Sequence, residues 1–253
     1  MMLPYPLTRP HRLRLAHAFA PIPRVDISIE CAIEDQMGKA FVDSTENPQL
    51  FMIEQDGFFC YFAGALNSTA GSAFLSRLPN GRMLMAGSPG WQTAVENSFD
   101  DNLIHISRDS YSSAALSVDH LRSLASSNPQ TPHVVRVDAA LAGTDTPYLD
   151  IGAFDSPDDF VARGIGFCMM KDGTIIGGAY SSLVCSNAIE VSIVVDPAQR
   201  RQGIATALSC QLLLWCLDHH LAPHWDAANA ESCSLAEKLG YTEARKYAAY
   251  YLK

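Results

Sequence analysis

The sequence predicts a mixed α/β domain over about residues 134–253, preceded by an α+β N-terminal half. Strand-like and helix-like segments alternate along the second half, an order typical of helices packed on a sheet. Asp172-Gly173 also separates two apolar runs there, Ile165 to Met170 and Thr174 to Tyr180. Because an Asp-Gly pair between apolar runs favours a tight turn, this segment predicts a β-hairpin.

The composition bounds the class of protein. The chain has 253 residues, 48% of them hydrophobic and 18% charged, so one large or two modest domains would fit. A formal net charge of −9 argues against a nucleic-acid surface, which needs clustered Lys and Arg, and suits a cationic substrate or no charge preference. Seven cysteines without a C-x-x-C pair favour reduced, buried thiols and a cytoplasmic location over disulfides or zinc.

The first residues are interrupted by prolines, and no stretch reaches the ~18 apolar residues of a membrane span. We therefore expect neither a secretory signal nor a membrane segment. In the N-terminal half, Val25 to Ile29 alternates like a half-buried strand, and Asp56-Gly57 predicts a hairpin between Leu50 to Ile53 and Phe58 to Phe62. A short strand, a turn and a helix are expected at 82–85, 87–90 and 91–99.

Between residues 107 and 132 the composition shifts to Ser, Asn and Pro, with a helix expected from Val118 to Ala125. Ser126 to Pro132 is the strongest linker candidate, so we expect an N-terminal α+β domain over 1–132 and a second domain over 133–253. Both halves place Asp-Gly between apolar runs. Duplication of one ancestral domain would explain this, and chance repetition of a common hairpin is the alternative.

The second half begins with a strand from Val134 to Val137 and an irregular loop from Gly143 to Asp155. Ser156 as a cap, Pro157 at the first helical position and acids in the first turn predict a helix start. Ala188 to Val195 is a β-branched strand that ends at Asp196-Pro197.

A helix from about Gly203 to His219 is apolar on most sides and should be buried against the sheet. A short strand follows from His224 to Ala227. Apolar residues then recur at helical spacing up to Leu239, and Gly240 supplies the stop before one or two strands from Tyr241 to Leu252.

The segment Arg200 to Ala205 joins a β-branched strand to an apolar helix, and a helix start offers unpaired N–H groups and a positive dipole end to an anion. Arg200, Gly203 and Ala205 match the acyl-CoA pattern of the GCN5-related N-acetyltransferase (GNAT) superfamily: Gln or Arg, two residues, Gly, one residue, Gly or Ala. Asn229 followed by Leu235 to Tyr241 resembles the later helix of that family.

The resemblance covers the second half of the chain and implies a GNAT-like, mostly antiparallel mixed sheet with flanking helices. The N-terminal half would then be a divergent GNAT-like copy, degenerate because no turn like that at Arg200 follows Arg82 to Met85. A closer resemblance links Trp225, Asp226, Asn229 and Leu235 to Tyr241 with the zwittermicin A acetyltransferase-like branch.

The resemblance implies acetyl-CoA as co-substrate. Its pantetheine chain would meet backbone groups of a splayed strand, its diphosphate the helix start, and its arm the later helix. The implied contacts are Ile193, Val194, Val195, Arg200, Arg201, Gln202, Gly203, Ile204, Ala205, Thr206, Asn229 and Ser232. For Arg201, an ordinary solvated side chain is an equal alternative.

Transfer to an amine needs a base, because an alkylamine of pKa ~10.4 is mostly protonated at pH 7. Glu190 lies close to where some family members place a catalytic glutamate, and the alternative is a solvent-facing or ion-paired side chain. Many members carry a Tyr general acid at the position of Ala236. Ser232, Tyr250 or unassisted release of a thiolate of pKa ~8.5 would have to serve instead.

Histidines and acids elsewhere in the second half give weaker indications of function. His219, His220 and His224 lack a metal-binding pattern, so no metal site is expected. Four acids lie where the family has variable substrate loops and would attract a cationic amine, although a helix start explains two of them: Asp150, Asp155, Asp158 and Asp159.

We expect an N-acetyltransferase that moves an acetyl group from acetyl-CoA to a primary amine of a small molecule by direct attack. Acetylation of a protein or peptide amine is an alternative. From another class, the domain would be a catalytically silent acyl-CoA-binding sensor.

Overall fold

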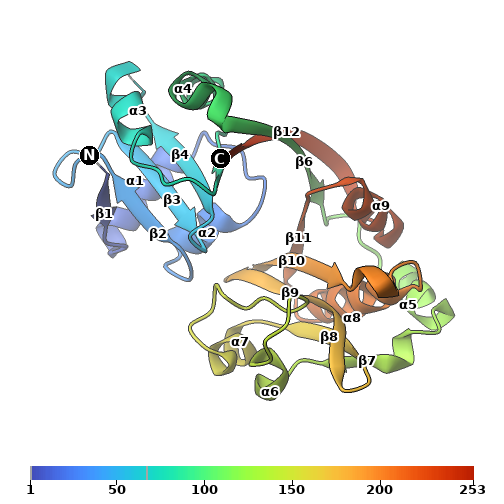
Figure 1. Cartoon of the computed structure of the whole chain (residues 1–253). Helices are drawn as coiled ribbons and strands as arrows, with labels where there is room; N and C mark the ends of the chain where they lie inside the picture. The colour runs from blue at the N-terminus through green and yellow to red at the C-terminus, as the bar shows by residue number, and fades with distance from the viewer. Residues whose placement is uncertain (1, 67) are drawn as a thin grey trace. The chain divides into compact units, whose positions relative to one another are not determined.

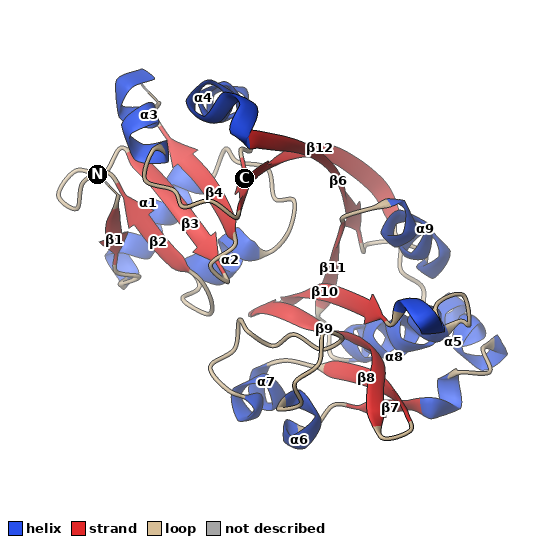
Figure 2. Cartoon of the chain, viewed as in Figure 1, coloured by secondary structure: helices blue, strands red, loops and turns tan. Residues whose placement is uncertain are grey.

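The computed structural model describes residues 2–66 and 68–253. Tertiary contacts divide the chain into two compact units, which we call the first and the second unit. The first unit comprises the residues up to Arg108 together with Lys246–Lys253, and the second comprises Asp109–Arg245. Figures 1 and 2 label the helices and strands of both units.

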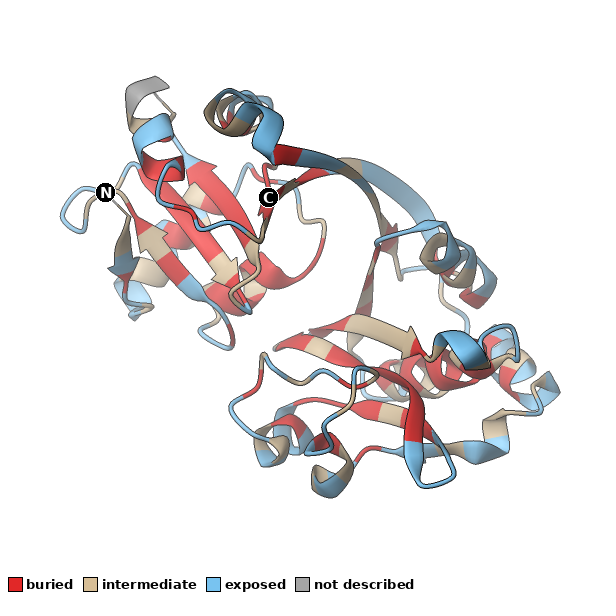
Figure 3. Ribbon diagram, in the orientation of Figure 1, coloured by how far each residue is buried: buried red, intermediate tan, exposed pale blue. Residues whose placement is uncertain are grey.

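The first unit is a sheet with helices on both faces. Its strands, in order across the sheet, are β1 (Leu3–Tyr5), β2 (Lys39–Val42), β3 (Leu50–Gln55), β4 (Phe59–Gly64), β5 (Arg82–Met85) and β12 (Thr242–Leu252). Its helices are α1 (Arg9–Phe19), α2 (Ser28–Ile33), α3 (Ser68–Leu75) and α4 (Pro89–Phe99). Successive residues of β3 face opposite sides, so that Ile53 packs in a core with Phe19 and Met52 in another core with Trp91. Strands β3 and β4 are mostly buried (Figure 3).

The second unit holds six strands. Their order across the sheet is β6 (Leu103–Ser112), β11 (Ala222–Ala227), β10 (Ala188–Val195), β9 (Thr174–Cys185), β8 (Gly166–Lys171) and β7 (Val134–Arg136). The helices are α5 (Val118–Ser127), α6 (Ala139–Ala142), α7 (Pro157–Arg163), α8 (Ile204–Asp218) and α9 (Ala230–Leu239). Only β10 and β11 are parallel among these described pairs. This mixed, mostly antiparallel sheet confirms the predicted fold class.

Helix α8 packs against one face of this sheet and against α5. Adjacent residues of β9 show what covers each face. A Cβ at Gly177 would lie 3.4 Å from Ile204 of α8, whereas a Cβ at Gly178 would lie 2.4 Å from the carbonyl oxygen of Tyr148. The loop between α6 and α7 therefore passes over the face opposite α8.

Both predicted hairpins are confirmed. The turn between β3 and β4 has positive φ at Asp56 (49°) and Gly57 (60°), and the turn between β8 and β9 has positive φ at Asp172 (50°) and Gly173 (80°). A type I′ turn requires positive φ at both central residues, which explains why Asp-Gly located these turns from sequence.

Three local expectations were wrong. Residues 25–29 form no strand, because Asp26 accepts a hydrogen bond from the N–H of Ser28 (2.9 Å) and starts α2 there. The expected turn at 87–90 is the beginning of α4, where Ser88 accepts from the N–H of Trp91 (3.4 Å). The third is an omission, because no strand was expected where β6 (Leu103–Ser112) lies.

The two units divide at other positions than the predicted boundary at residue 132. Residues 109–111 of β6 pair with β11 in the second unit, and Tyr250–Leu252 of β12 pair with β5 in the first unit. The chain therefore returns at its C-terminal end to complete the first sheet. The assignment of 1–132 and 133–253 as ancestral domains stays a prediction.

One element order occurs twice along the chain: strand, two helices, three strands, helix, strand, helix, strand. It runs from β1 to β6 and again from β7 to β12, with α5 between the two sets. The strands on either side of the third helix are parallel in both sets, β4 with β5 and β10 with β11. This correspondence supports the predicted duplication.

Candidate functional site

The strand pair β10 and β11 separates within the second unit. The two strands pair from Ala188 to Glu190, but from Trp225 onward β11 pairs with β6 instead. Beyond Glu190, β10 keeps only β9 as a partner. One edge of β10, which carries Ile193, Val194 and Val195, therefore has no neighbouring strand among the described residues, and its backbone groups face an opening.

The connection from β10 to α8 forms a tight loop at this opening. Arg201 (φ 63°) and Gly203 (φ 85°) both adopt the left-handed region. Ala207 is the first residue of the helix whose N–H bonds a carbonyl, that of Gly203 at 3.0 Å. Among the described residues, no acceptor faces the N–H groups of Ile204, Ala205 or Thr206. Such a set of donors, at the positive end of a 15-residue helix, fits an anion.

Side chains on this loop divide by exposure. Arg200, Arg201 and Gln202 are exposed, so their polar groups are available to a ligand. Ile204 and Thr206 are buried, so their side chains support the helix and only their main chain is available.

Asn128 fixes the loop from outside it. Its side-chain amide donates to the carbonyl of Gly203 (2.9 Å), and its Oδ1 accepts from the N–H of Gln130 (3.0 Å). A Cβ at Gly203 would lie 3.0 Å from Asn128 Oδ1. Sequence reasoning assigned Asn128 to a linker, and no local pattern indicates this contact with a distant loop.

The second motif builds the start of α9. Asn229 caps the helix by accepting from the N–H of Ser232 (2.9 Å), and Ser232 Oγ accepts from Trp225 Nε1 of β11 (3.1 Å). The Ser232 hydroxyl proton remains a donor. Ala236 is fully buried in a core with Leu213 and Trp225. The position where the family carries its Tyr therefore lies in the core of the second unit.

The other end of α9 meets α8. Lys238 Nζ donates to Thr206 Oγ1 in the first turn of α8 (3.1 Å). His120 of α5 lies with Nε2 2.9 Å from the carbonyl oxygen of Lys238. The sequence alone did not predict this contact, because helical spacing does not report which neighbour a long side chain reaches.

Glu190 is the last residue of β10 that pairs with β11, at the point where the two strands separate. Alternate residues of β10 share a face, so Ser192 lies with Val194, while Val191 and Ile193 pack with α8. Val194 is opposite Gly178, the residue over which the α6–α7 loop passes. Glu190 is 9% exposed and lies beside a register shift in the pairing of β10 with β9.

Tyr180 connects the loop to β10. It is the register partner of Ser192, and its hydroxyl is hydrogen-bonded to the Ser192 side chain and to the N–H of Asp150. Burial raises the pKa of Tyr180, so it is a neutral hydrogen-bonding group at physiological pH. It is a third residue that sequence reasoning missed.

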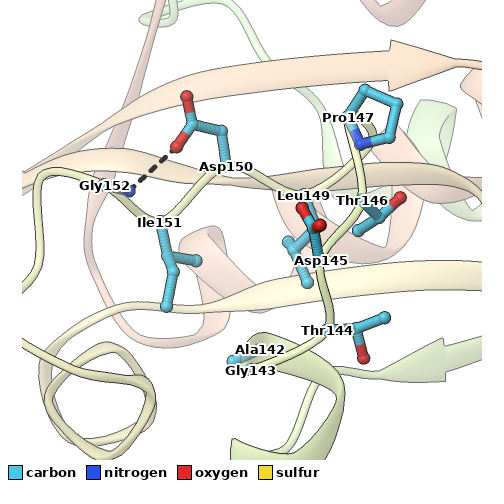
Figure 4. A pocket seen from close by; sticks show the side chains of 10 residues that line it. All are labelled: Ala142, Gly143, Thr144, Asp145, Thr146, Pro147, Leu149, Asp150, Ile151 and Gly152. Atoms are coloured by element: carbon cyan, nitrogen blue, oxygen red, sulfur yellow. Dashed lines mark hydrogen bonds between the residues drawn. The ribbon is translucent and has the colours of Figure 1, made fainter.

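The α6–α7 loop itself forms a pocket of about 540 Å³ (Figure 4). The residues that line it include two acids and no base: Ala142, Gly143, Thr144, Asp145, Thr146, Pro147, Leu149, Asp150, Ile151 and Gly152. Asp150 accepts from the N–H of Gly152 (2.9 Å, dashed in Figure 4), which shapes the loop.

The remaining acids have local partners. Ser156 caps α7, with Asp158 and Asp159 in its first turn, and Asp159 forms an ion pair with Arg163 (2.6 Å). The hydrogen bond from Arg163 lowers the pKa of Asp159. Asp159 also accepts from the N–H of Asp155 (3.2 Å). These contacts account for the three acids as parts of a helix start.

The described residues contain no cluster of three or more His, Cys, Asp or Glu able to hold a metal ion. His219 stacks on Trp215 with ring centroids 3.8 Å apart. Burial raises the pKa of Cys168 and Cys210 to about 11 and that of Cys216 to about 12, which removes these thiols as nucleophiles. None of the described helices is both long and apolar enough to cross a bilayer.

Comparisons with known proteins agree on one family. A model of the GNAT acetyltransferase family matches residues 25–250. The uncharacterized N-acetyltransferase YdfB of Bacillus subtilis (strain 168) is 21% identical over 226 residues, covering 85% of this chain and 85% of its own length.

Among solved structures, a GCN5-related N-acetyltransferase-like protein from Streptococcus suis 89/1591 has a TM-score of 0.83 at 26% identity, covering 96% of this chain and 98% of its own. A tandem GNAT protein from the clavulanic acid biosynthesis pathway has a TM-score of 0.58 at 13% identity, covering 99% and 97%. The second likeness shows a shared fold.

Proposed function

The chain belongs to the GNAT acetyltransferase family, whose model matches residues 25–250, and we propose that it transfers an acetyl group from acetyl-CoA to the primary amine of a small molecule. The observation that carries this proposal is the position of Glu190. Glu190 is 9% exposed and is the last residue of β10 that pairs with β11, which supports a base at the point where the two strands separate.

The donor set of the second unit fits the coenzyme. Backbone groups of Ile193, Val194 and Val195 would hold the pantetheine chain along the open edge of β10. The N–H groups from Gly203 to Thr206, with Arg200, Arg201 and Gln202, would hold the diphosphate, and Asn229 and Ser232 would line the arm. These contacts combine unpaired donors with a helix dipole, the features that bind phosphate groups.

The corresponding connection in the first unit offers much less. Residues 59–75, which include β4 and the described part of α3, contain no Lys or Arg. A diphosphate there would lack a cation on either side of the turn. We therefore assign coenzyme binding to the second unit alone.

The chemistry requires the neutral amine. Deprotonating an alkylamine of pKa ~10.4 at pH 7 requires roughly 4.6 kcal/mol, at about 1.36 kcal/mol per pH unit. Glu190 would accept the amine proton while nitrogen attacks the thioester carbon, directly or through one water. The C–N bond forms, the C–S bond breaks, and the thiolate of CoA leaves with the electron pair.

The departing thiolate needs little assistance. Ala236 provides no acid and lies in the core. Ser232 is the candidate general acid, because its hydroxyl oxygen accepts from Trp225 and its proton remains a donor. A thiol of pKa ~8.5 is a good leaving group without protonation, so the reaction does not depend on a tyrosine here.

The pocket of the α6–α7 loop supports an amine acceptor of small size. It is formed by the loop that passes over Gly178, and Asp145 and Asp150 give it negative character without a basic residue in the lining. A cationic amine would be attracted to such a pocket before losing its proton to Glu190. A peptide amine is the alternative acceptor of the same chemistry.

The test is acetyl-CoA-dependent thiol release with a panel of small amines and lysine peptides. We expect turnover with a small amine, and a drop of about 100-fold in kcat for Glu190→Gln, within the 10²–10⁴ range of general base catalysis. The exposed Glu243→Gln is the matched control and should retain wild-type turnover. Full activity in Glu190→Gln would remove Glu190 as the base.

A catalytically silent acyl-CoA sensor is the second candidate, favoured by the buried Ala236 at the family's Tyr position. It predicts that acetyl-CoA raises the melting temperature while no amine in the panel gives turnover. At 100 times the dissociation constant, a ligand stabilises the folded state by about 2.7 kcal/mol. Absence of any such stabilisation would reject both candidates.

A further inference from the structure

Lys238 occupies an unusual electrostatic position. Its ammonium donates a hydrogen bond to Thr206 Oγ1 (3.1 Å) in the first turn of α8, although the side chain is exposed. The first turn of a helix carries positive partial charge, so a cation held there is repelled by the protein itself. An anion bound at the same turn would reverse that repulsion.

Lys238 is held both at its side chain and at its main chain. Thr206 fixes the ammonium, and His120 of α5 donates to the carbonyl of Lys238 (2.9 Å), which fixes the main chain. Immobilising a long side chain opposes its rotamer entropy, so exposed lysines usually remain mobile. The ammonium also acts on the buried thiol of Cys210, whose pKa it lowers against the larger effect of burial.

The C-terminus of α9 explains part of this arrangement. A lysine in the last turn of a helix interacts favourably with the negative end of its dipole. That interaction accounts for a lysine at this position, but it would be as favourable with the ammonium in solvent. The dipole of α9 therefore does not explain why the Lys238 ammonium contacts the start of α8.

Two further cations lie beside the same turn. Arg200 and Arg201 precede α8 and are exposed, in a chain with a net charge of −9. Arg200 Nε donates to the carbonyl of Val195 (3.5 Å), and Lys238 reaches the first turn of α8. Three positive residues therefore belong to the elements that meet at a helix start with unpaired N–H groups. Phosphate is the ligand chemistry that such a group of donors and cations fits.

We propose that Lys238 is a coenzyme-contacting residue, whose ammonium pairs with a phosphate of CoA at the start of α8. This inference rests on the proposed function and adds a residue of α9 to the phosphate site. CoA carries a diphosphate and a 3′-phosphate, and the shared chemistry is an ion pair reinforced by a hydrogen bond.

The test measures binding by isothermal titration calorimetry on the full chain, with CoA and 3′-dephospho-CoA as probes. We expect Lys238→Gln to raise the Kd of CoA about tenfold and Lys238→Arg to stay within about threefold of the wild type. Lys171→Gln in the β8–β9 hairpin removes the same charge away from the site and should change the Kd less than twofold.

The probes identify the phosphate. If Lys238 pairs with the 3′-phosphate, Lys238→Gln and the wild type bind 3′-dephospho-CoA with equal Kd. If it pairs with the diphosphate, Lys238→Gln raises the Kd of CoA and of 3′-dephospho-CoA by the same factor. Equal binding of both probes by Lys238→Gln and the wild type would overturn the inference while leaving the proposed function intact. Failure of the wild type to bind CoA would instead remove the proposed function.

Discussion

The side-chain amide of Asn128 donates a 2.9 Å hydrogen bond to the carbonyl of Gly203, across 75 positions of sequence. Asn128 follows α5, and Gly203 is the residue that turns the chain into α8. The bond orients the Gly203 peptide, whose carbonyl also accepts from Ala207 at 3.0 Å. The segment that follows α5 therefore helps to shape the proposed phosphate site.

Substituting Gly203 by Ala should impair both folding and coenzyme binding. Positive φ costs an L-residue about 1–2 kcal/mol, and here a Cβ would also press on Asn128 Oδ1 at 3.0 Å. Gly173→Ala is the matched control, since its φ of +80° is close to the +85° of Gly203 but nothing lies within 4 Å of a Cβ. Urea unfolding should show similar losses for both variants, and only Gly203→Ala should raise the Kd of acetyl-CoA, by about tenfold. Equal coenzyme affinity in the two variants would contradict the site.

Removal of the Asn128 side chain tests its positioning role. Asn128→Ala loses a hydrogen bond worth about 1 kcal/mol and frees the Gly203 peptide to rotate. We expect the Kd of acetyl-CoA to rise about fivefold while kcat at saturation stays within twofold. Gln130→Ala serves as the control, because only its backbone N–H contacts Asn128. A fall in kcat without a change in affinity would assign Asn128 to another role.

Tyr180→Phe tests the acceptor side independently of the coenzyme. The variant loses the hydroxyl that joins Ser192 to the N–H of Asp150, so the α6–α7 loop is less firmly held on β9 and β10. The KM for the amine should rise about fivefold to tenfold, with the Kd of acetyl-CoA unchanged in calorimetry. If acetyl-CoA affinity falls while the amine KM is constant, the loop does not bind the acceptor.

Asp26 should make stability depend on pH. It is buried, and desolvation raises its pKa above 3.8 despite hydrogen bonds from Tyr61 and from the N–H of Ser28. The folded state therefore holds this proton more tightly than the unfolded state. The protonated Asp26 carboxyl therefore adds to the free energy of unfolding. This stabilisation is fully present below the pKa of Asp26 in the unfolded state and is lost as pH rises through its pKa in the folded state.

Urea unfolding between pH 4 and 8 would measure this loss. The amide introduced in Asp26→Asn cannot ionise, so the free energy of unfolding of this variant should fall less as pH rises. The exposed Asp101→Asn should show the same pH dependence as the wild type. A wild-type slope that persists in Asp26→Asn would show that another group is responsible.

Deletion of Lys246–Lys253 should destabilise the first unit in particular. The segment pairs with β5 and buries Ala249, Tyr250 and Leu252 in the cores of that unit. Removing three buried side chains costs on the order of 5 kcal/mol or more. Hydrogen exchange should accelerate in β3 to β5, while β8 to β10 keep their protection. Deletion of Lys253 alone is the control, and unchanged exchange in β3 to β5 would contradict this pairing.

Local chemistry allowed much of the fold to be predicted. The two Asp-Gly turns, the cap at Ser156 and the stop at Gly240 depend on residues within a few positions of one another. The strand β10 and the helix α8 followed from β-branched and apolar runs. The same local information located the loop from Arg200 to Ala205, whose role in coenzyme binding stays a prediction.

Tertiary structure alone decided what meets across long sequence distances. The exchange of strand ends at β6 and β12, the contact of Asn128 with Gly203, and the reach of Lys238 to Thr206 join residues that no local pattern relates. Residues 126–132 have the composition of a linker, yet they are held because α5 packs on α8. Propensity acts over a few residues, whereas the partner of a strand edge or a polar side chain is set by packing of the whole chain.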